Sequence, residues 1–323
     1  MEVVLVTGTA GFIGFHTAKV LLESGYAVIG IDNFCDYYDV RLKEDRHRIL
    51  EQYPHYTGHR IDICDASRME AIFEENSVDY IIHLAAQAGV RYSLEKPTLY
   101  IQTNALGFGI LIDLARRYAV KHFIYASSSS VYGANTRIPF KETDCVEEPL
   151  SVYGATKKAN ELIAYSYSHL FQLPTTGLRF FTVYGPFGRP DMAFFKFTKA
   201  LFEGTPIDLY NNGDMRRDFT YIDDIVTGIL GVLKSIPDKE PPYVIYNIGN
   251  TICVPLEQCI DILERATGKK ANIRYLPMQD GDMYATYSDI TALHNAVGYT
   301  PTTSVEEGIP RFVDWYKEYY KIA

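Results

Sequence analysis

The sequence is poor in cysteine, and its cysteines are not spaced for metal binding. It has five, an odd number, and no two of them form a C-x-x-C pair; they are Cys35, Cys64, Cys145, Cys253 and Cys259. Structural zinc sites normally take cysteine or histidine ligands at short, repeated spacings. We therefore expect reduced thiols, no metal site and a cytoplasmic location, since disulfides are rare in that compartment.

The chain also lacks the features typical of membrane proteins and of nucleic-acid-binding proteins. No apolar run approaches the ~20 residues that a membrane-spanning helix needs, and the short run after Glu2 does not make a signal peptide. The 31 lysines and arginines are outnumbered by 40 aspartates and glutamates, which gives a net charge of -9. We expect neither nucleic acid nor a membrane as a partner. A local group of arginines can still bind a small anion.

Apolar segments that alternate with helical segments predict the fold class. The length of 323 residues is enough for about two domains. The run "EVVLVTG" (2–8) is typical of a strand that is buried on both faces. Further strands are predicted at 27–32, 59–64, 78–86, 121–128 and 175–185, and helices near 12–24, 39–50, 67–76, 97–118 and 153–171. This order predicts an α/β fold with a doubly wound parallel (Rossmann) sheet.

A glycine-rich loop follows the first predicted strand. The segment "TGTAGFIG" places Gly8, Gly11 and Gly14 where the chain turns into a helix. Glycine there lets the backbone turn tightly and approach a pyrophosphate at the helix N-terminus. Asp32 ends the second predicted strand about 20 residues on, where a carboxylate binds an adenosine ribose and repels a 2′-phosphate. The pattern predicts NAD rather than NADP; the alternative is an ordinary turn with a helix-capping Asp.

Two later strand ends are expected to complete the NAD site. Asp62, in "DIC" at the end of the third predicted strand, is placed to bind the adenine amino group, unless it is only a surface residue. The fourth predicted strand ends in "HLAAQAG", whose small residues let a cofactor lie over the strand tip. His83 in that segment is expected to be a core residue. The other residues expected around NAD are Phe12, Ile13, Asn33, Ile63, Leu84, Ala85 and Ala86.

The pattern becomes less regular after Pro186, which indicates a second unit. We predict a NAD-binding domain over 1–185 and a smaller, mixed α/β substrate-binding domain over 186–323. The run "YVIYNIG" (243–249) is typical of a core strand that returns to the first sheet, so the two are partly interleaved. In this unit, helices are predicted near 193–203, 222–235, 256–267 and 304–320, and strands at "IDLY" and "IRYL".

Four consecutive serines follow the fifth predicted strand, in "SSSSVYG" (127–133). They form either a soft loop or a cluster of hydroxyl donors aimed at a polar ligand. Tyr153 and Lys157 lie four residues apart on the next predicted helix, hence on one face. A nearby ammonium favours a phenolate, and so does a nicotinamide cation. Tyr153 is therefore a candidate general base for a substrate hydroxyl.

These motifs together resemble the extended short-chain dehydrogenase/reductases that act on nucleotide sugars. The resemblance runs from "TGTAGFIG" through "SSSSVYG" and the Tyr153/Lys157 pair to "RRDFTYIDD" (216–224), and covers nearly the whole chain. In that family, the Ser or Thr at the position of Ser128 binds the sugar 4-hydroxyl. The resemblance implies that Ser128, Tyr153 and Lys157 are catalytic, and that the serines are a donor cluster rather than a soft loop.

Four segments are similar to UDP-glucuronate 4-epimerases in particular: "DNFCDYYDVRLKEDR" (32–46), "AAQAGVRYS" (85–93), "RFFTVYGPFGRPDMA" (179–193) and "PMQDGDMYATYSDI" (277–290). In those enzymes the carboxylate end of the substrate is held by residues that match Ser128, Ser129, Ser130, Thr182 and Arg189. An arginine can pair with a carboxylate through two hydrogen bonds, and hydroxyls can fill the remaining lone pairs.

The similarity also implies contacts to the nucleotide. Arg217, in "RRDF", is expected to pair with the UDP diphosphate unless it is a surface residue, and Arg91 is a phosphate or carboxylate candidate. Relatives show Q-P-G-D where this chain has Asp280 in place of the proline. Asp282, the expected contact to the uridine ribose, is kept.

The resemblance leaves related reactions as alternatives. Sugar-nucleotide 4,6-dehydratases and UDP-glucuronate decarboxylases usually carry an acid just before "VYG", where this chain has Ser129 and Ser130. We therefore expect reversible 4-epimerisation of UDP-glucuronate to UDP-galacturonate through a 4-keto intermediate. The alternatives are the same reaction on UDP-glucose or UDP-N-acetylglucosamine, decarboxylation of UDP-glucuronate, and a non-catalytic NAD-binding protein, which the intact Tyr153 and Lys157 disfavour.

A homodimer is also expected. Relatives usually dimerise by packing the helices near 97–118 and 153–171 into a four-helix bundle. The apolar residues that permit such packing are Leu99, Leu106, Ile110, Leu162 and Ile163.

Overall fold

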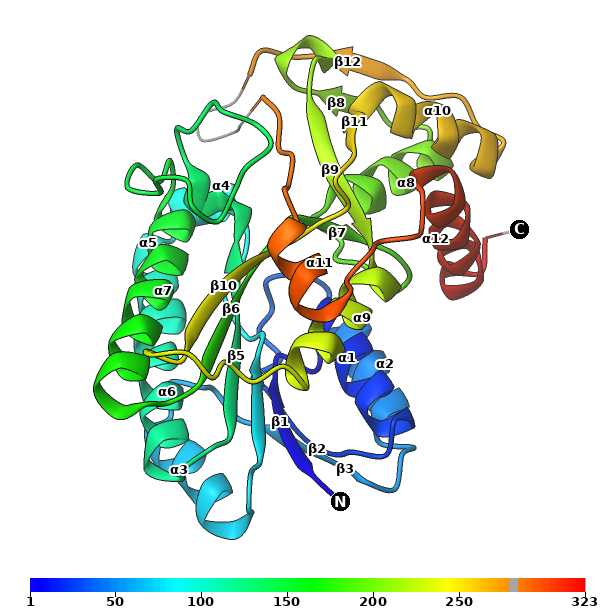
Figure 1. The fold of residues 1–323 in the computed structure, drawn as a ribbon. Coiled ribbons are helices and arrows are strands. Elements are labelled where there is room, and N and C mark those ends of the chain that lie inside the picture. The colour runs from blue at the N-terminus through cyan, green and yellow to red at the C-terminus, as the bar shows by residue number, and fades with distance from the viewer. Residues whose placement is uncertain (279–283, 323) are drawn as a thin grey trace.

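A seven-stranded parallel sheet forms the centre of the computed structural model, which describes residues 1–278 and 284–322. The strand order is β10-β6-β5-β4-β1-β2-β3, with helices on both faces (Figure 1). The strands are β1 (Val3–Thr7), β2 (Ala27–Asp32), β3 (Tyr56–Arg60), β4 (Tyr80–His83), β5 (His122–Ser128), β6 (Thr175–Phe180) and β10 (Tyr243–Ile248). β2 and β3 lie on one side of β1, while β4, β5 and β6 lie on its other side, so the strand order reverses at β1. The predicted doubly wound sheet is confirmed.

Both faces of the sheet are buried, as the apolar strand pattern predicts. Successive side chains of a strand point to opposite faces. Val4 and Val6 of β1 therefore belong to one core cluster with Phe15, while Leu5 belongs to the other with Phe108. The first face is covered by α1 (Phe12–Glu23), α2 (Val40–Leu50) and α9 (Ile222–Leu233), and the second by α3 (Ala66–Glu75), α6 (Gly107–Arg117) and α7 (Val152–Phe171) (Figure 1).

The helix predicted over 97–118 is interrupted. It consists of α5 (Pro97–Tyr100), a π-helical stretch (Ile101–Leu106) and α6. The wider π turn releases backbone groups from the helical ladder. The carbonyl of Asn104 there accepts a hydrogen bond from the Asn160 side chain of α7 at 2.7 Å. The side chain of Asn104 bonds both backbone groups of Gln87, just after β4, at 2.9 and 3.0 Å. The interruption thus ties α7 to the end of β4.

Three predicted strands have clearly different bounds in the structure, and the one predicted over 78–86 covers only Tyr80–His83. The third strand in chain order was predicted over 59–64 but β3 ends at Arg60, because Asp65 caps α3 by accepting from the Arg68 N–H and the intervening residues form a turn. The run predicted over 175–185 is two strands that separate at Phe181. The first, β6, lies in the large sheet, and the second, β7 (Thr182–Tyr184), pairs with β9 (Arg216–Tyr221).

The second half of the chain builds smaller sheets beside the carboxyl ends of the large one (Figure 1). β9 lies between β7 and β11 (Cys253–Pro255), and β8 (Ile207–Leu209) pairs with β12 (Ile273–Tyr275). The helices are α8 (Ala193–Glu203), α10 (Leu256–Thr267), α11 (Thr291–Val297) and α12 (Val305–Tyr320), and α4 (Val90–Glu95) lies in the first half. β10 pairs with β6. The division into domains at residues 185 and 186 stays a prediction. Within the described ranges, no helix is both long and apolar enough to cross a membrane.

Candidate active site

A cleft of about 820 Å³ opens along the carboxyl ends of the large sheet. Every site residue that the sequence predicts lines it, except Asp62 and Asp282. Asp62 lies beyond the end of β3, and its carboxylate accepts from the Asn33 amide at 2.8 Å and from the Cys64 N–H at 2.9 Å. Asp282 lies outside the described residues. The sheet edge therefore gathers residues that are up to about 200 positions apart in the chain.

The glycine loop has no room for side chains. Gly8 has a φ of +80°, and a Cβ on Gly8 would lie 2.9 Å from the Ala85 nitrogen. A Cβ on Gly14 would lie 2.0 Å from the Gly8 carbonyl oxygen. The loop therefore packs against the tip of β4 and leads directly into α1, the arrangement that receives a dinucleotide pyrophosphate.

Asp32 joins the glycine loop to the end of β2. Its carboxylate accepts hydrogen bonds from the Ala10 N–H at 3.1 Å and from the Phe34 N–H at 2.8 Å. An ionised carboxylate has about four acceptor positions, so two remain for a ribose diol. Asp32 lines the cleft beside Gly11 and Asn33. These residues fit an NAD molecule.

The buried His83 orders the tip of β4. Its Nδ1 lies 2.8 Å from the Thr7 hydroxyl, which also accepts from the Leu84 and Ala85 N–H groups at 3.1 Å each. Burial lowers the pKa of His83 to about 3, so its ring is neutral. The expected core role of this histidine is confirmed.

The four serines do not form a soft loop. Ser127 and Ser128 end β5, and Ser129 and Ser130 begin a 3₁₀ turn. The Ser128 hydroxyl accepts from the Ser130 N–H at 3.1 Å, which fixes the turn. The Ser127 hydroxyl donates to Glu161 at 2.7 Å and so has a buried partner. Ser128, Ser129 and Ser130 all line the cleft.

The tyrosine and lysine occupy the first two turns of α7. The Ser151 hydroxyl caps this helix by accepting from the Gly154 N–H at 3.0 Å. The Lys157 ammonium donates to the Ala126 carbonyl of β5 at 2.7 Å, and burial lowers its pKa to about 8. Burial also raises the pKa of Tyr153, although a hydrogen bond with Ser128 and the charge of Arg189 act in the opposite direction. The chain alone therefore does not make Tyr153 a phenolate near neutral pH.

The buried Lys157 predicts a specific pH dependence of stability. A cation whose folded pKa is lowered destabilises the fold at low pH, and this penalty disappears as the pH rises from the folded value of about 8 to the ordinary value of 10.5. The unfolding free energy of the native chain should therefore rise by about 3 kcal/mol over this window relative to a Lys157→Met variant. Urea denaturation of both proteins at pH 7, 9 and 10.5 measures the difference. A difference that does not change with pH would contradict the assignment of a buried ammonium.

Thr182, Arg189 and Asp191 line the same cleft as Tyr153, and Arg189 is close enough for its charge to act on the pKa of Tyr153. The Arg189 guanidinium donates to the Asp191 carboxylate at 3.0 and 2.6 Å and to the Ala88 carbonyl at 3.3 Å. The Tyr37 hydroxyl donates to the same carboxylate at 3.2 Å. The side chain of Arg189 is about one fifth exposed. A guanidinium has five N–H donors, so a second carboxylate can share this one.

The two remaining predicted arginines also line the cleft. The Arg91 guanidinium stacks over the Tyr210 ring, 4.7 Å from its centroid. Arg217 donates to the Arg216 and Tyr284 carbonyls at 2.8 and 3.2 Å. Arg91 lies on α4, and Arg217 lies on β9 of the three-stranded sheet.

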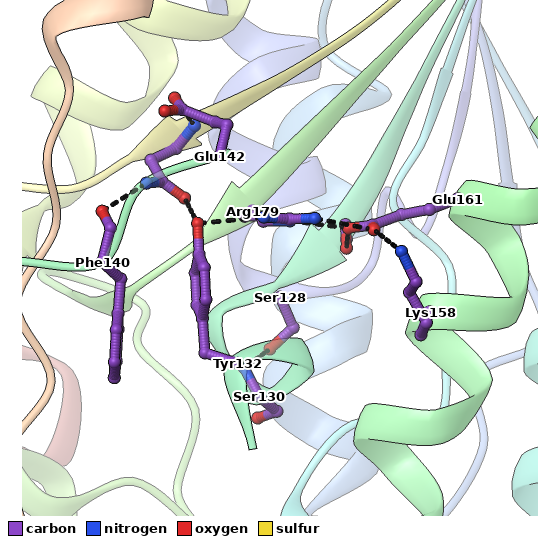
Figure 2. A network of polar contacts seen from close by, with 10 residues as sticks. Ser128, Ser130, Tyr132, Phe140, Glu142, Lys158, Glu161 and Arg179 are labelled. Carbon is purple, nitrogen blue, oxygen red and sulfur yellow. Dashed lines mark hydrogen bonds and ion pairs between the residues drawn. The ribbon is translucent and has the colours of Figure 1, made fainter. Parts of the chain in front are cut away.

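A buried polar network supports the helix that carries Tyr153 and Lys157 (Figure 2). Glu161, two turns after Tyr153, pairs with Arg179 of β6 at 2.8 and 2.9 Å, and the two side chains are 1% and 2% exposed. Arg179 also donates to the Tyr132 hydroxyl at 3.0 Å, and this hydroxyl donates to Asn247 of β10 at 2.6 Å. Together with Ser127, this network joins α7 to three neighbouring strands of the sheet.

Several residues that line the cleft were not predicted from the sequence. They are Tyr37, Tyr38, Lys43, Gln87, Asp191 and Lys196, among others. The first three lie in "DNFCDYYDVRLKEDR" and Asp191 lies in the segment 179–193, so the segments were recognised but not the roles of these residues. Within residues 1–278 and 284–322, no three His, Cys, Asp or Glu side chains are grouped to hold a metal ion.

Comparison with known proteins finds relatives that match nearly the whole chain in sequence and in fold. A probable UDP-glucuronate 4-epimerase of Rhizobium meliloti (strain 1021) is 46% identical, over 99% of this chain and 98% of its own. The crystal structure of UDP-glucuronic acid 4-epimerase from Bacillus cereus, in complex with UDP-glucuronic acid and NAD, has a TM-score of 0.92 at 34% identity and covers 99% of this chain and 100% of its own.

The similarity extends to an epimerase that acts on a neutral sugar. The UDP-glucose 4-epimerase of Thermotoga maritima, solved with UDP-glucose, has a TM-score of 0.89 at 30% identity, over 99% of this chain and 100% of its own. The family model described as "NAD dependent epimerase/dehydratase family" matches residues 4–249. The chain therefore belongs to the NAD dependent epimerase/dehydratase family.

Proposed function

We propose that this protein interconverts UDP-glucuronate and UDP-galacturonate by epimerisation at C4, with NAD bound tightly in the cleft. One observation carries the proposal. The guanidinium of Arg189 and the hydroxyl of Thr182 line the same cleft as the hydrogen-bonded pair Ser128 and Tyr153. A uronate sugar carries its C4 hydroxyl and its carboxylate on neighbouring ring carbons, so a base and a carboxylate site in one cleft can serve the same sugar. The relatives from Rhizobium and Bacillus support the same activity.

The NAD site would be built by the glycine loop, Asp32 and the tip of β4. The loop and the α1 N-terminus would receive the pyrophosphate, and Asp32 the adenosine ribose. Bound there, NAD supplies the group that accepts the C4 hydride and later returns it, and its oxidised ring is a positive charge. Lys157 lies at the same end of the cleft, so its side chain would meet the nicotinamide ribose.

Tyr153 would act as the general base and later as the general acid. Burial raises its pKa in the protein alone, so it holds its proton until positive charge is added nearby. An ammonium or another cation at close range stabilises the phenolate. The phenolate then takes the proton of the C4 hydroxyl, which Ser128 orients. When the sugar has turned over and its other face is presented, the same hydroxyl returns the proton.

The carboxylate site would determine what happens to the 4-keto sugar. This intermediate is a β-keto acid and can lose CO₂: the C5–C6 bond breaks, its electron pair passes into the C4 carbonyl as an enolate, and C5 takes a proton from water. The bond breaks readily only when it is aligned with the carbonyl π system. We propose that Arg189, Thr182 and the serines hold the carboxylate out of that alignment.

Thr182→Val and Arg189→Met are therefore expected to increase the fraction of decarboxylated UDP-pentose product, at a lower total rate. The threonine variant loses one hydroxyl, while the arginine variant loses the charge and should have the larger effect, by about tenfold or more. Product analysis by NMR at equal conversion measures the fraction. Lys199→Met, an exposed residue on α8, is the control. A product ratio equal to that of the native protein in both variants would show that these residues do not control decarboxylation.

The test of the function itself is a substrate panel. Purified protein without added NAD is incubated separately with UDP-glucuronate, UDP-glucose and UDP-N-acetylglucosamine, and the products are identified by NMR. We expect only UDP-glucuronate to be converted. Turnover of a neutral sugar alone would support the activity of the Thermotoga relative and would remove Arg189 from its role. A UDP-pentose as the main product would favour the decarboxylase alternative, although Ser129 and Ser130 stand where decarboxylases usually carry an acid.

We further propose that the protein is a cytoplasmic homodimer. All five cysteines are free thiols in the structure, as suits a reducing compartment. The π-helical stretch and α7 carry exposed apolar side chains, among them Leu106, Leu162 and Phe171, which are 54%, 58% and 47% exposed. Such exposed apolar side chains are typical of a subunit interface. The mass in solution, measured by light scattering, tests this state.

A further inference from the structure

Arg46 of α2 is fully buried, and within residues 1–278 and 284–322 all its hydrogen-bond acceptors are neutral. Its side chain has no exposed surface. It donates to the Ala10 carbonyl at 2.8 Å, to the Tyr38 hydroxyl at 2.7 Å, and to the Phe187 and Gly188 carbonyls at 2.6 and 3.3 Å. Its Nε is buried without a hydrogen-bond partner. A buried cation held only by neutral acceptors is energetically costly, and methionine would fill similar space more cheaply.

The acceptors of Arg46 belong to two loops that are far apart in the sequence. Ala10 lies in the glycine loop, between Gly8 and Gly11, while Phe187 and Gly188 directly precede Arg189. Nη1 bonds the first loop and Nη2 the second. The planar guanidinium fixes the angle between its donors. Arg46 therefore sets how the two loops lie relative to each other.

The loop before Arg189 needs such support. Phe187 has a φ of +56°, a left-handed conformation that is unfavourable for a residue with a side chain. The conformation is held by the bond from Arg46 to the Phe187 carbonyl and by ring contacts with Phe15 and Trp315, at 5.1 and 5.0 Å between centroids. Arg189, which lines the cleft, follows two residues later.

A second contact from the same segment reaches the same loop. Tyr37 donates to Asp191, which in turn accepts both bonds from Arg189. The segment 37–46 thus holds the loop 187–191 at both ends, through Arg46 and through Tyr37. Neither contact is needed to form the large sheet, because both lie beyond the carboxyl ends of its strands.

We propose that Arg46 is a positioning residue that aligns the Arg189 loop with the glycine loop, so that the carboxylate site stands at a fixed place relative to the NAD site. The inference rests on the proposed function, because it assigns Arg189 to the substrate carboxylate. It predicts that loss of Arg46 weakens recognition of the carboxylate and control over decarboxylation, not recognition of the nucleotide.

The test is Arg46→Met, with Arg48→Met as the matched control. Arg48 lies on the same helix, but its side chain is 69% exposed and pairs only with Asp45. Two quantities are measured on the NAD-loaded protein: the ratio of the Kd for UDP to the Kd for UDP-glucuronate by calorimetry, and the fraction of UDP-pentose among the products. In Arg46→Met we expect this ratio to fall about tenfold and the pentose fraction to rise, with the Kd for UDP unchanged. Arg48→Met should match the native protein.

Two further variants separate positioning from stability. Arg46→Lys keeps the charge but cannot bond both loops in one plane, so it should behave like Arg46→Met. Tyr38→Phe removes one acceptor from Arg46. It should lower the Kd ratio and raise the pentose fraction, each by a smaller factor than Arg46→Met does. If the Arg46 variants do not fold, Tyr38→Phe tests the positioning role. A merely structural role would lower the amount of folded protein and leave both ratios at their native values, which would overturn the proposal. If the native protein does not convert UDP-glucuronate, the proposed function fails, whereas the Kd ratio still tests the role of Arg46.

Discussion

Replacing Tyr153 by phenylalanine is expected to lower kcat for UDP-glucuronate epimerisation by about 10³-fold, within the range of 10²–10⁴ that general acid–base catalysis contributes. The variant loses only the hydroxyl that bonds Ser128, and the ring keeps its contact with Tyr100, at 6.1 Å between centroids. The Kd for UDP-glucuronate should change little, because the nucleotide and carboxylate contacts remain. NMR analysis of samples quenched at timed intervals measures kcat, and calorimetry measures the Kd for UDP-glucuronate.

Tyr167→Phe is the control for this prediction. Tyr167 lies on the same helix, and its hydroxyl faces Asp113 of α6 at 3.5 Å instead of the cleft. Its replacement should leave kcat near the native value. A Tyr153→Phe variant that keeps more than a tenth of the native kcat would contradict the assignment of the general base. Loss of UDP-glucuronate binding in that variant would instead place Tyr153 in substrate binding.

Replacing Arg179 by methionine is expected to lower the free energy of unfolding by about 3–5 kcal/mol, because the buried Glu161 carboxylate loses its two hydrogen bonds to the guanidinium. Among the described residues it keeps only the Ser127 hydroxyl and the more distant Lys158 ammonium, at 3.5 Å. The ion pair is almost fully buried, and each side chain has further polar partners in the network of Figure 2. Combining Arg179→Met with Glu161→Leu removes both charges and should recover part of the loss. Urea denaturation, followed through the fluorescence of the single tryptophan, Trp315, measures all three proteins.

An exposed ion pair provides the contrast. Arg274 pairs with Asp208 at 2.7 and 2.9 Å, and its side chain is 61% exposed. Arg274→Met should therefore cost about 1 kcal/mol or less. If Arg179→Met cost no more than this control, the network would not be the support of α7 that its geometry indicates.

The pattern of apolar residues predicted the large sheet because parallel strands with helices on both faces leave a simple signal. "VVLVT" has no polar residue before its final threonine, and its alternating side chains enter two separate cores. The glycine loop was predictable for a similar reason. The close contacts at Gly8 and Gly14 exclude any side chain, so the sequence has little freedom there.

Features that depend on contacts between distant segments could not be predicted in this way. The run 175–185 is uniformly strand-like, yet it divides at Phe181. Its first half, β6, pairs with β10 in the large sheet, and its second half, β7, pairs with β9 in a smaller sheet. "YTGHR" of β3 has hardly any apolar residues and is a strand because it pairs with β2. Asp62 was predicted to end the third strand, but β3 ends at Arg60, and the adenine contact of Asp62 stays a prediction.

The chemistry of the site was partly predictable. Spacing on a predicted helix pointed to Tyr153 and Lys157, the family resemblance pointed to Ser128, and all three line one cleft. The effect of burial was not predictable from spacing: it raises the pKa of Tyr153 and lowers that of Lys157, so it opposes the charged form of both groups. The supporting contacts of Arg46 and Asp191 join segments about 140 and 150 residues apart, and local spacing carries no sign of them.

The most direct test of the proposed reaction uses UDP-glucuronate that carries deuterium at C4, with purified protein, no added NAD and ordinary water. The account predicts UDP-galacturonate that keeps its deuterium at C4, because the hydride leaves and returns within one closed cleft while only the hydroxyl proton passes through Tyr153. NMR of the product distinguishes the outcomes. Product with hydrogen at C4, or no product even after NAD is supplied, would contradict the account.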